Sequence, residues 1–303
     1  MEESKAMDAA IIRRYLSPVK LLGLINLMRP KQWVKNAFVL APLVFSASFL
    51  NATAVSHALL VMLLFCLASS AAYILNDMHD IEYDFCHSEK SKARPLATGI
   101  VSVSAAVILL ISLYVALIWG FGFITPAPKV IITIVAYLML NLAYTFVLKY
   151  QPVVDIFVIA IGFVLRVYAG AVVLNVSLSS WMFMTTLCLA LYLASIKRRQ
   201  ELKKQGSSKS RKVLEKYSIS LVNYYAEISA IGALIFYSIF VMSMKPELVI
   251  TMPLVLFGFF RYWFVAEILD AGESPTEALL ADWQLLLTVV LWVVACIWVL
   301  WPV

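Results

Sequence analysis

Hydrophobic and polar residues alternate along this chain in long blocks. Nine apolar runs are separated by shorter polar or charged segments, and a run of about 20 apolar residues is long enough for an α-helix to cross a membrane. The pattern therefore predicts an all-α, polytopic membrane protein with nine transmembrane helices. The expected helices cover residues 36–51, 57–76, 100–121, 130–148, 153–174, 181–196, 218–243, 249–268 and 283–301.

The composition points to the same class of protein. Of the 303 residues, 63% are hydrophobic and 14% are charged, whereas soluble domains carry about 25% charged residues. The four cysteines contain no CxxC pair, so neither a zinc site nor a disulfide framework is expected. The chain has no GxxxxGK and no GxGxxG after a strand, which argues against a P-loop or Rossmann enzyme. The apolar stretch 21–28 is short and lacks a cleavage site, so no signal peptide is expected.

Lysine and arginine are distributed unevenly between the predicted helices. Twenty of the 24 lie before the first apolar run, in the segment 77–99, at Lys149, or between residues 197 and 216. The positive-inside rule places these segments, and the N-terminus with them, in the cytoplasm. We expect a multi-pass protein of the inner (plasma) membrane, with a cytoplasmic segment at 1–23 and a single transmembrane domain at 24–303.

An acidic motif follows the second predicted helix. If that helix continues, Asp77, Asp80 and Asp84 stand at i, i+3 and i+7, which is one helix face, with Asn76 beside them. Carboxylates at this spacing repel one another unless a cation lies among them, and oxygen ligands suit Mg²⁺. The motif predicts a Mg²⁺ site formed by these three aspartates; the alternative is a solvated helix end.

Basic and polar residues recur beside the cytoplasmic ends of the other predicted helices. Each group has a simpler alternative role, as an interface anchor, a topology signal or a binding site for anionic lipid. An arginine inside a predicted helix is different, because an ionised side chain in a membrane span usually faces the bundle interior or a watery cavity. The candidate site residues of these groups are Lys31, Lys35, Arg94, Tyr144, Lys149, Asp155, Arg166, Lys197, Arg198 and Glu201.

Carboxylates and bases at one end of an apolar helical bundle suit a phosphorylated substrate with Mg²⁺. The metal would bridge carboxylates to a diphosphate, and lysine and arginine would neutralise the remaining oxygens. A diphosphate held in this way becomes a good leaving group. Because the bundle interior can receive a lipid chain, the sequence predicts a transferase that uses a diphosphate donor and a membrane lipid.

Several motifs resemble those of the UbiA superfamily of intramembrane prenyltransferases. They are NDxxDxxxD at 76–84, KARPLATG at 92–99 and YTFVLK at 144–149. Three further segments resemble the branch of that family that transfers phosphoribosyl groups to decaprenyl phosphate. These are RPKQWVKNAFVLAP at 29–42, DIFVIAIGFVLRVYAGA at 155–171 and KRRQEL at 197–202.

The resemblance implies attack by a polyprenyl phosphate on C1 of phosphoribosyl diphosphate, with release of diphosphate, in a pathway that makes a lipid-linked arabinofuranose donor. It implies that the three aspartates bind Mg²⁺ on the diphosphate, and that Asp155 and Glu201 contact ribose or metal. A carboxylate near the ribosyl centre would stabilise an oxocarbenium-like transition state. Asp155 and Asp80 are both candidates for that role.

Two other functions stay open from the sequence. An aromatic prenyltransferase of the same fold would carry a second aspartate-rich motif after the sixth helix, where this chain has Lys197-Arg198-Arg199-Gln200-Glu201. A non-enzymatic carrier of polyprenyl phosphate would need charged groups that are accessible from both sides of the membrane. The sequence leaves the polyprenol length and the oligomeric state undetermined.

Overall fold

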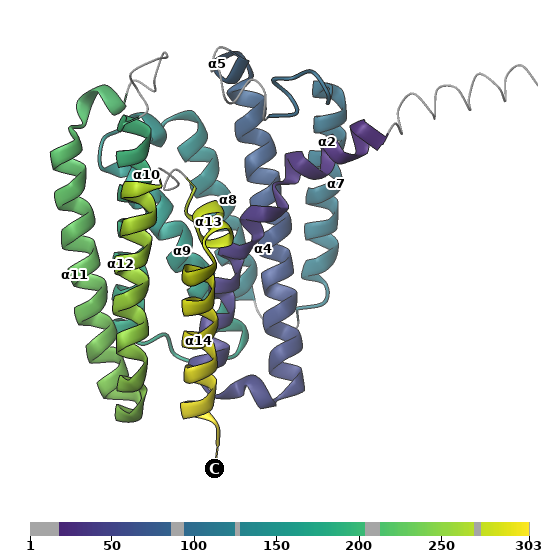
Figure 1. Ribbon diagram of the computed structural model, residues 1–303. Coiled ribbons are helices and arrows are strands. Elements are labelled where there is room, and N and C mark those ends of the chain that lie inside the picture. Colours follow the sequence, from purple (N-terminus) through teal and green to yellow (C-terminus); the bar gives the residue numbers. More distant parts are fainter. Residues whose placement is uncertain (1–17, 86–93, 125–127, 204–212, 270–273, 303) are drawn as a thin grey trace, which may run out of the picture. The chain divides into compact units, whose positions relative to one another are not determined.

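The computed structural model describes residues 18–85, 94–124, 128–203, 213–269 and 274–302, and within these ranges the chain is helical and contains no strand. Most of the N-terminal segment expected at 1–23, and the bases Lys90 and Lys92, lie outside the described residues. Eight described helical segments are long and apolar enough to cross a membrane (Figure 1). They are α4 (Ala52–His79), α7 (Val103–Phe121), α8 (Pro128–Phe146), α9 (Val154–Val173), α10 (Ser180–Lys203), α11 (Ile219–Met244), η6 with α12 (Pro246–Thr251 and Met252–Ile268) and α14 (Trp283–Leu300).

The first of the nine expected helices, 36–51, differs from the prediction. This part of the chain consists of a 3₁₀-helix η1 (Pro30–Leu40), a short α3 (Ala41–Phe45) and a 3₁₀ turn η2 (Ser48–Leu50). The eight long helices therefore correspond to the other eight predicted runs. A 3₁₀-helix of 11 residues is unusual, since such helices rarely exceed 3–4 residues, and so packing must stabilise it.

A close approach between η1 and α9 supplies part of that packing. A Cβ atom added at Gly170 of α9 would lie only 2.0 Å from the backbone oxygen of Val39 in η1. Glycine at this position is therefore what lets the two backbones touch, as small residues do at helix contacts in membranes. Asn36 of η1, fully buried, also bonds to Arg166 of α9.

The chain divides into two compact units, which are described separately. The first unit contains residues 18–30 and 66–121 of the described chain. In it, α2 (Pro18–Met28) packs against the second half of α4 and against α7, around a core of Leu27, Ala71, Ile74, Leu96, Val101, Ala106 and Leu113. The Ser70 hydroxyl donates to the carbonyl of Met28 at 2.9 Å and so satisfies a free acceptor at the end of α2.

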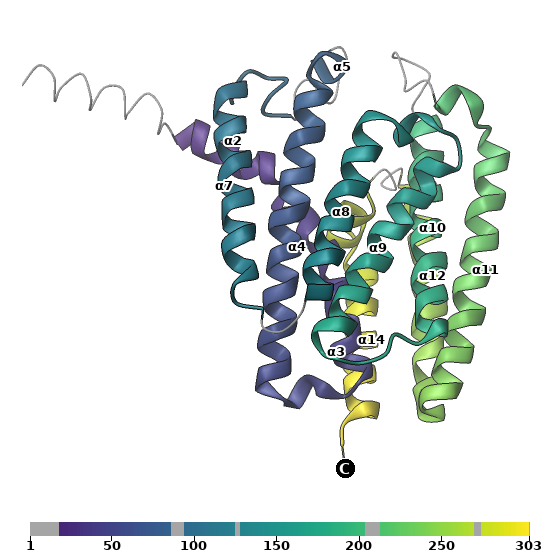
Figure 2. The ribbon, with the colours of Figure 1, turned by 180° about the vertical axis from the view of Figure 1, so that it is seen from behind.

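The second unit contains residues 31–65 and the described residues from 122 onward. Its long helices α10 and α11 run side by side, with α9 on another face of α10 (Figure 2). Short elements join or cover the long ones: η3 (Leu148–Tyr150), η5 (Leu214–Lys216) and α13 (Pro275–Ala281). The turn η3 directly precedes α9, and Tyr217, which follows η5, bonds Val153 and Asp155 at the start of α9.

Candidate active site

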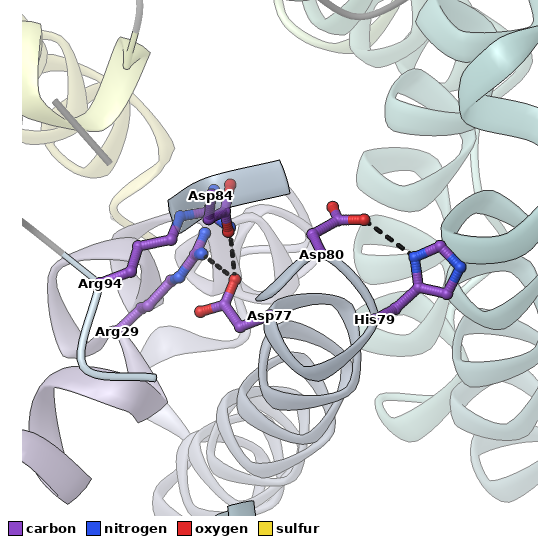
Figure 3. A network of polar contacts seen from close by, with 6 residues as sticks. All are labelled: Arg29, Asp77, His79, Asp80, Asp84 and Arg94. Atoms are coloured by element: carbon purple, nitrogen blue, oxygen red, sulfur yellow. Dashed lines mark hydrogen bonds and ion pairs between the residues drawn. The ribbon is translucent and has the colours of Figure 1, made fainter. Parts of the chain in front are cut away.

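In the first unit, the acidic motif gathers around one arginine. Nη1 of Arg94 lies 2.7 Å from Oδ1 of Asp77 and also bonds Oδ2 of Asp84 (Figure 3). As whole residues, Asp77 and Asp84 are each 2% exposed. Arg94 is held by its own turn, because its carbonyl accepts from the Thr98 N–H and the chain reverses at Gly99 with φ 73°. The predicted spacing therefore brings two of the three aspartates together on a single cationic atom.

A second arginine contacts the same cluster from the end of α2. Nη2 of Arg29 lies 2.5 Å from Oδ1 of Asp77, and its guanidinium lies over the Tyr73 ring at 5.0 Å. The Arg29 backbone has φ 54°, a left-handed conformation that is uncommon for a residue other than glycine. Such conformations cluster at functional sites, where the surrounding structure holds them. The sequence analysis did not select Arg29 as a site residue.

The third aspartate is directed away from the other two. Helix α4 ends at His79, and α5 (Ile81–Phe85) begins after Asp80, so the helix does not continue unbroken through the motif. The Asp80 carboxylate pairs with Nδ1 of His79 at 2.9 Å and points away from Asp77 and Asp84 (Figure 3). Throughout the described chain, no group of three or more His, Cys, Asp or Glu side chains is placed to hold one metal ion.

In the second unit, Arg198 of α10 is the centre of a polar network. Its Nε lies 2.8 Å from Oδ2 of Asp155, its Nη2 lies 3.2 Å from the Tyr144 hydroxyl, and its Nη1 bonds Glu201. Arg198 and Asp155 are both 0% exposed. The Lys197 ammonium lies 3.9 Å from Glu201, one helical turn away. Five of the residues predicted from sequence are thus joined in one cluster.

Tyr217 completes the environment of Asp155. Its hydroxyl donates to Oδ1 of Asp155 at 2.7 Å and accepts from the Val153 N–H at 2.5 Å. Burial raises the pKa of Tyr217 above its usual value, and the neighbouring Asp155 adds to this effect, so the phenol stays protonated and remains a donor. Val153 has φ 69°, which is a rare backbone conformation for a β-branched residue.

A neighbouring cluster ties the end of α10 to α12. Arg199 bonds Glu267, and the Lys203 ammonium reaches the other oxygen of Glu267 at 2.9 Å. The Gln200 amide donates to the backbone oxygen of Ala266. These contacts fix the rotation of α10 about its axis, and so they fix the direction in which Arg198 points.

Arg166 lies inside the second unit with each guanidinium nitrogen bonded. Nε donates to Asn36 at 2.8 Å, Nη1 to the carbonyl of Gly162 at 2.8 Å, and Nη2 to the Tyr137 hydroxyl at 2.9 Å. The rings of Phe65, Tyr137 and Phe163 lie within cation–π distance of its guanidinium. The sequence predicted Arg166 as a phosphate-binding residue, and the structure shows that it holds η1 and α8 against α9.

The remaining predicted residues have varied exposure. Lys31 is exposed, whereas Lys35 and Asn76 are half-buried. Lys149 is 2% exposed, and its ammonium lies 5.3 Å from the centre of the Tyr150 ring. The roles of these four residues in substrate binding stay predictions.

Sequence analysis missed residues whose importance depends on distant partners. Arg29, Tyr217 and Glu267 contact site residues 48, 62 and 68 positions away. Spacing within a motif carries no information about such pairs. A signal for Arg29 did exist, because it directly precedes Pro30 in the motif at 29–42.

Comparisons with known proteins agree with this architecture. The sequence model of the "UbiA prenyltransferase family" matches residues 38–278. A decaprenyl-phosphate phosphoribosyltransferase of Corynebacterium glutamicum is 32% identical over 283 residues, which cover 89% of this chain and 84% of that protein. The enzyme of the same name from Mycolicibacterium smegmatis is 34% identical over 227 residues, covering 73% and 70%.

A solved structure has the same fold. A UbiA homolog from Archaeoglobus fulgidus, bound to GPP and Mg²⁺, aligns with a TM-score of 0.69 and 20% identity. The alignment covers 92% of this chain and 99% of that one. At this identity the likeness concerns the fold alone.

Proposed function

Because the chain belongs to the UbiA prenyltransferase family, we propose that it transfers the 5-phosphoribosyl group of phosphoribosyl diphosphate to a polyprenyl phosphate and releases diphosphate. The protein is then a glycosyltransferase, specifically a pentosyltransferase. The observation that carries this proposal is the 32–34% identity, over 70% or more of each chain, to relatives named decaprenyl-phosphate phosphoribosyltransferase. The family match over 38–278 includes parts of both units, which supports a single transmembrane domain at 24–303.

The chemistry of α10 favours this activity over prenyl transfer to an aromatic acceptor. The C-terminal end of α10 carries Lys197, Arg198 and Arg199, where a second aspartate-rich motif would hold a prenyl diphosphate. Phosphoribosyl diphosphate brings a 5-phosphate and a diphosphate, and the lipid acceptor brings another phosphate. Lysine and arginine bind three anionic groups more favourably than further carboxylates would.

The acidic cluster has the donor set that Mg²⁺ requires. Oδ1 of Asp77 and Oδ2 of Asp84 already converge on one cationic atom, Nη1 of Arg94, and Mg²⁺ is commonly held by one or two carboxylates together with substrate phosphates. Asp77 and Asp84 would hold the ion, with Asp80 as the predicted third ligand. When bound, Mg²⁺ stabilises negative charge on the departing diphosphate.

The chain's own residues bind the substrates and hold the reacting groups in place. Arg94, Lys31, Lys35, Asn76, Tyr144, Lys149 and Lys197 bind and orient phosphate oxygens. A phosphate monoester is already anionic near neutral pH, so the acceptor oxygen needs no strong general base. It forms a bond to C1 of the ribose as the bond from C1 to the diphosphate oxygen breaks, and the electron pair leaves with diphosphate.

Asp155 acts through Arg198 in this proposal. Both of its oxygens are engaged, one by Tyr217 and one by Arg198, and it is fully buried. Asp155 therefore fixes the guanidinium whose other nitrogens face Tyr144 and Glu201. Glu201, with 15% of its side chain exposed, is the more accessible carboxylate of this cluster, and we assign the ribose contact to it.

We place the N-terminus and both charged clusters on the cytoplasmic side of the inner membrane, because the positive-inside rule puts 20 of the 24 lysines and arginines there. The segment 30–45 is proposed to be a ninth crossing. Gln32 bonds Ser274 and Thr276 shortly before α14, and the Phe49 ring lies 5.8 Å from Trp301 just after α14. At about 2.0 Å per residue for η1 and 1.5 Å for α3, this segment spans about 30 Å, which matches a bilayer core.

The product would be a phosphoribosylated lipid in a pathway that supplies a lipid-linked arabinofuranose donor for cell-surface glycans. The test uses purified protein, ribose-labelled phosphoribosyl diphosphate, polyprenyl phosphate and Mg²⁺, with and without EDTA. We expect label in the butanol-extractable lipid only when metal is present. Folded protein that gives no labelled lipid, but makes product from a prenyl diphosphate and an aromatic acceptor, would favour prenyl transfer instead. Movement of polyprenyl phosphate without any transfer would favour a carrier.

A further inference from the structure

The two carboxylates that would hold Mg²⁺ are already neutralised by arginine. Nη1 of Arg94 bonds Asp77 and Asp84 together, and Nη2 of Arg29 lies 2.5 Å from the same Asp77 oxygen (Figure 3). The atom Oδ1 of Asp77 thus has two cationic neighbours. A metal ion bound by Asp77 and Asp84 would lie within a few ångströms of the Arg94 guanidinium, where like charges repel strongly.

The exposure of these side chains shows which group can move. The carboxylates of Asp77 and Asp84 are 2% and 3% exposed, whereas Arg94 is 17% and Arg29 is 27% exposed. The acids are therefore fixed from within the unit, and the arginines approach from its surface. An arginine does not lose its proton in a protein, so when it leaves a carboxylate its charge is stabilised best by another anion or by an aromatic face.

Each arginine has another group to contact when it leaves the carboxylates. The Arg29 guanidinium already lies 5.0 Å from the Tyr73 ring centre, so it keeps that contact when it releases Asp77. A single nitrogen of Arg94, Nη1, contacts both carboxylates, and the guanidinium fork can instead bind two phosphate oxygens. The anion that arrives with the metal is the diphosphate of the donor, which supplies those oxygens.

We propose that Arg94 and Arg29 are resident counter-ions of the metal site, and that Mg²⁺ and the diphosphate enter together by exchange. This inference rests on the proposed function for the identity of the donor. Metal alone binds weakly, because it must displace an arginine that has no new partner. With a diphosphate present, Arg94 passes from the two carboxylates to the phosphate oxygens, and each ligand raises the affinity of the other by the same factor.

The arginine counter-ions also explain why the cluster is stable before substrate binds. Two buried carboxylates without a cation would repel each other and lose their solvation. With the arginines in place, the cluster keeps its conformation in the absence of the donor. Free metal is then excluded until a diphosphate is available, and the binding of the two ligands becomes coupled.

The experiment measures Mn²⁺ binding by the full-length protein in detergent, without donor, from the electron paramagnetic resonance signal of free Mn²⁺. Arg94→Gln removes the counter-ion, and we expect it to bind Mn²⁺ at least tenfold more tightly than the wild type. Arg94→Lys keeps the positive charge and is expected to stay near the wild-type affinity. Arg261→Gln is the matched control, because it removes an arginine from an ion pair with Asp282 in the other unit.

A second arm uses labelled inorganic diphosphate with excess Mg²⁺ in a filter-binding assay. There Arg94→Gln should bind diphosphate at least tenfold more weakly than the wild type, since the phosphate partner is gone. The inference is overturned if Arg94→Gln tightens Mn²⁺ binding no more than Arg261→Gln does, or if Arg94→Lys tightens it equally. Neither arm depends on phosphoribosyl transfer. A failure here with normal transfer by the wild type would therefore remove the exchange and leave the proposed function intact.

Discussion

Both charged clusters pair arginine with aspartate, but the exposure of the arginine differs between them. In the first unit the acids Asp77 and Asp84 are buried, and their arginine partners are partly exposed. In the second unit Arg198 and Asp155 are both fully buried, and Tyr144, Tyr217 and Glu201 surround them. The first cluster can therefore exchange its cations with solvent, whereas the second cannot.

This difference in exposure separates ion pairs that can open to bind a ligand from ion pairs that stabilise the fold. A partly exposed arginine can leave its partner at little desolvation cost, because water replaces part of the lost interaction. Removing one partner of a fully buried pair leaves an uncompensated charge and is strongly destabilising. We therefore expect substitutions in the first cluster to affect ligand binding, and substitutions of the fully buried pair Arg198 and Asp155 to affect folding.

The largest effect is expected for Asp77→Asn. Loss of the carboxylate that bonds both arginines should lower phosphoribosyl transfer by about 1000-fold, the scale seen when a preorganised electrostatic group is removed. The free energy of unfolding should change by about 1 kcal/mol or less, because Arg29 and Arg94 can turn to solvent. Transfer rates and denaturant unfolding check both numbers. Retained transfer in this variant would count against the metal role of Asp77.

Asp155→Asn is expected to lower stability more than Asp77→Asn does, because it disrupts a fully buried ion pair. It leaves Arg198, which is 0% exposed, without its nearest buried counter-charge, and should lower the free energy of unfolding by about 3 kcal/mol. The amide oxygen can still accept from Tyr217, so the variant isolates the loss of charge. Thermal unfolding in detergent measures this loss of stability. Wild-type stability together with lost transfer would move Asp155 into the group of substrate-contacting residues.

Gly170→Ala tests whether the second unit depends on the close approach of η1. Its added Cβ would lie 2.0 Å from the Val39 backbone oxygen, so η1 must shift away from α9. The overpacking should destabilise the protein by about 1–3 kcal/mol. Gly258→Ala is the control in the same unit, because the nearest atom to its added Cβ is a side-chain carbon at 3.7 Å. Equal unfolding midpoints for the two variants would show that η1 moves freely.

The smallest effect concerns an ion pair outside both clusters. Asp282 accepts from the Leu285 N–H at the start of α14, and its pair with Arg261 holds the pKa of Asp282 below its usual value. A lowered folded pKa means that this carboxylate stabilises the fold above the ordinary aspartate pKa, and that the contribution is lost as pH falls through the lowered value. Because asparagine can still cap α14, Asp282→Asn removes only the charged pair with Arg261 and should cost about 1 kcal/mol near neutral pH and less in acid. Unfolding at several pH values would detect this, and a pH-independent difference would contradict it.

Local motifs could be predicted from the sequence, and long-range partners could not. The apolar runs predicted eight of the long helices, and the i, i+7 spacing brought Asp77 and Asp84 together. The direction of Asp80 was not predictable, because it depends on a helix break at that residue. Nor was the 3₁₀ form of η1 predictable, since η1 is packed by residues far away in sequence, such as Gly170 against Val39.

The central claim is that the Asp77 and Asp84 cluster receives the donor diphosphate together with a metal ion. The most direct test is pulsed electron paramagnetic resonance of protein loaded with Mn²⁺ and phosphoribosyl diphosphate, after a desalting column has removed the free complex. We predict ³¹P couplings to protein-bound Mn²⁺ in the wild type and loss of the bound signal in Asp77→Asn. Bound Mn²⁺ without ³¹P coupling, or an unchanged signal in Asp77→Asn, would contradict the claim.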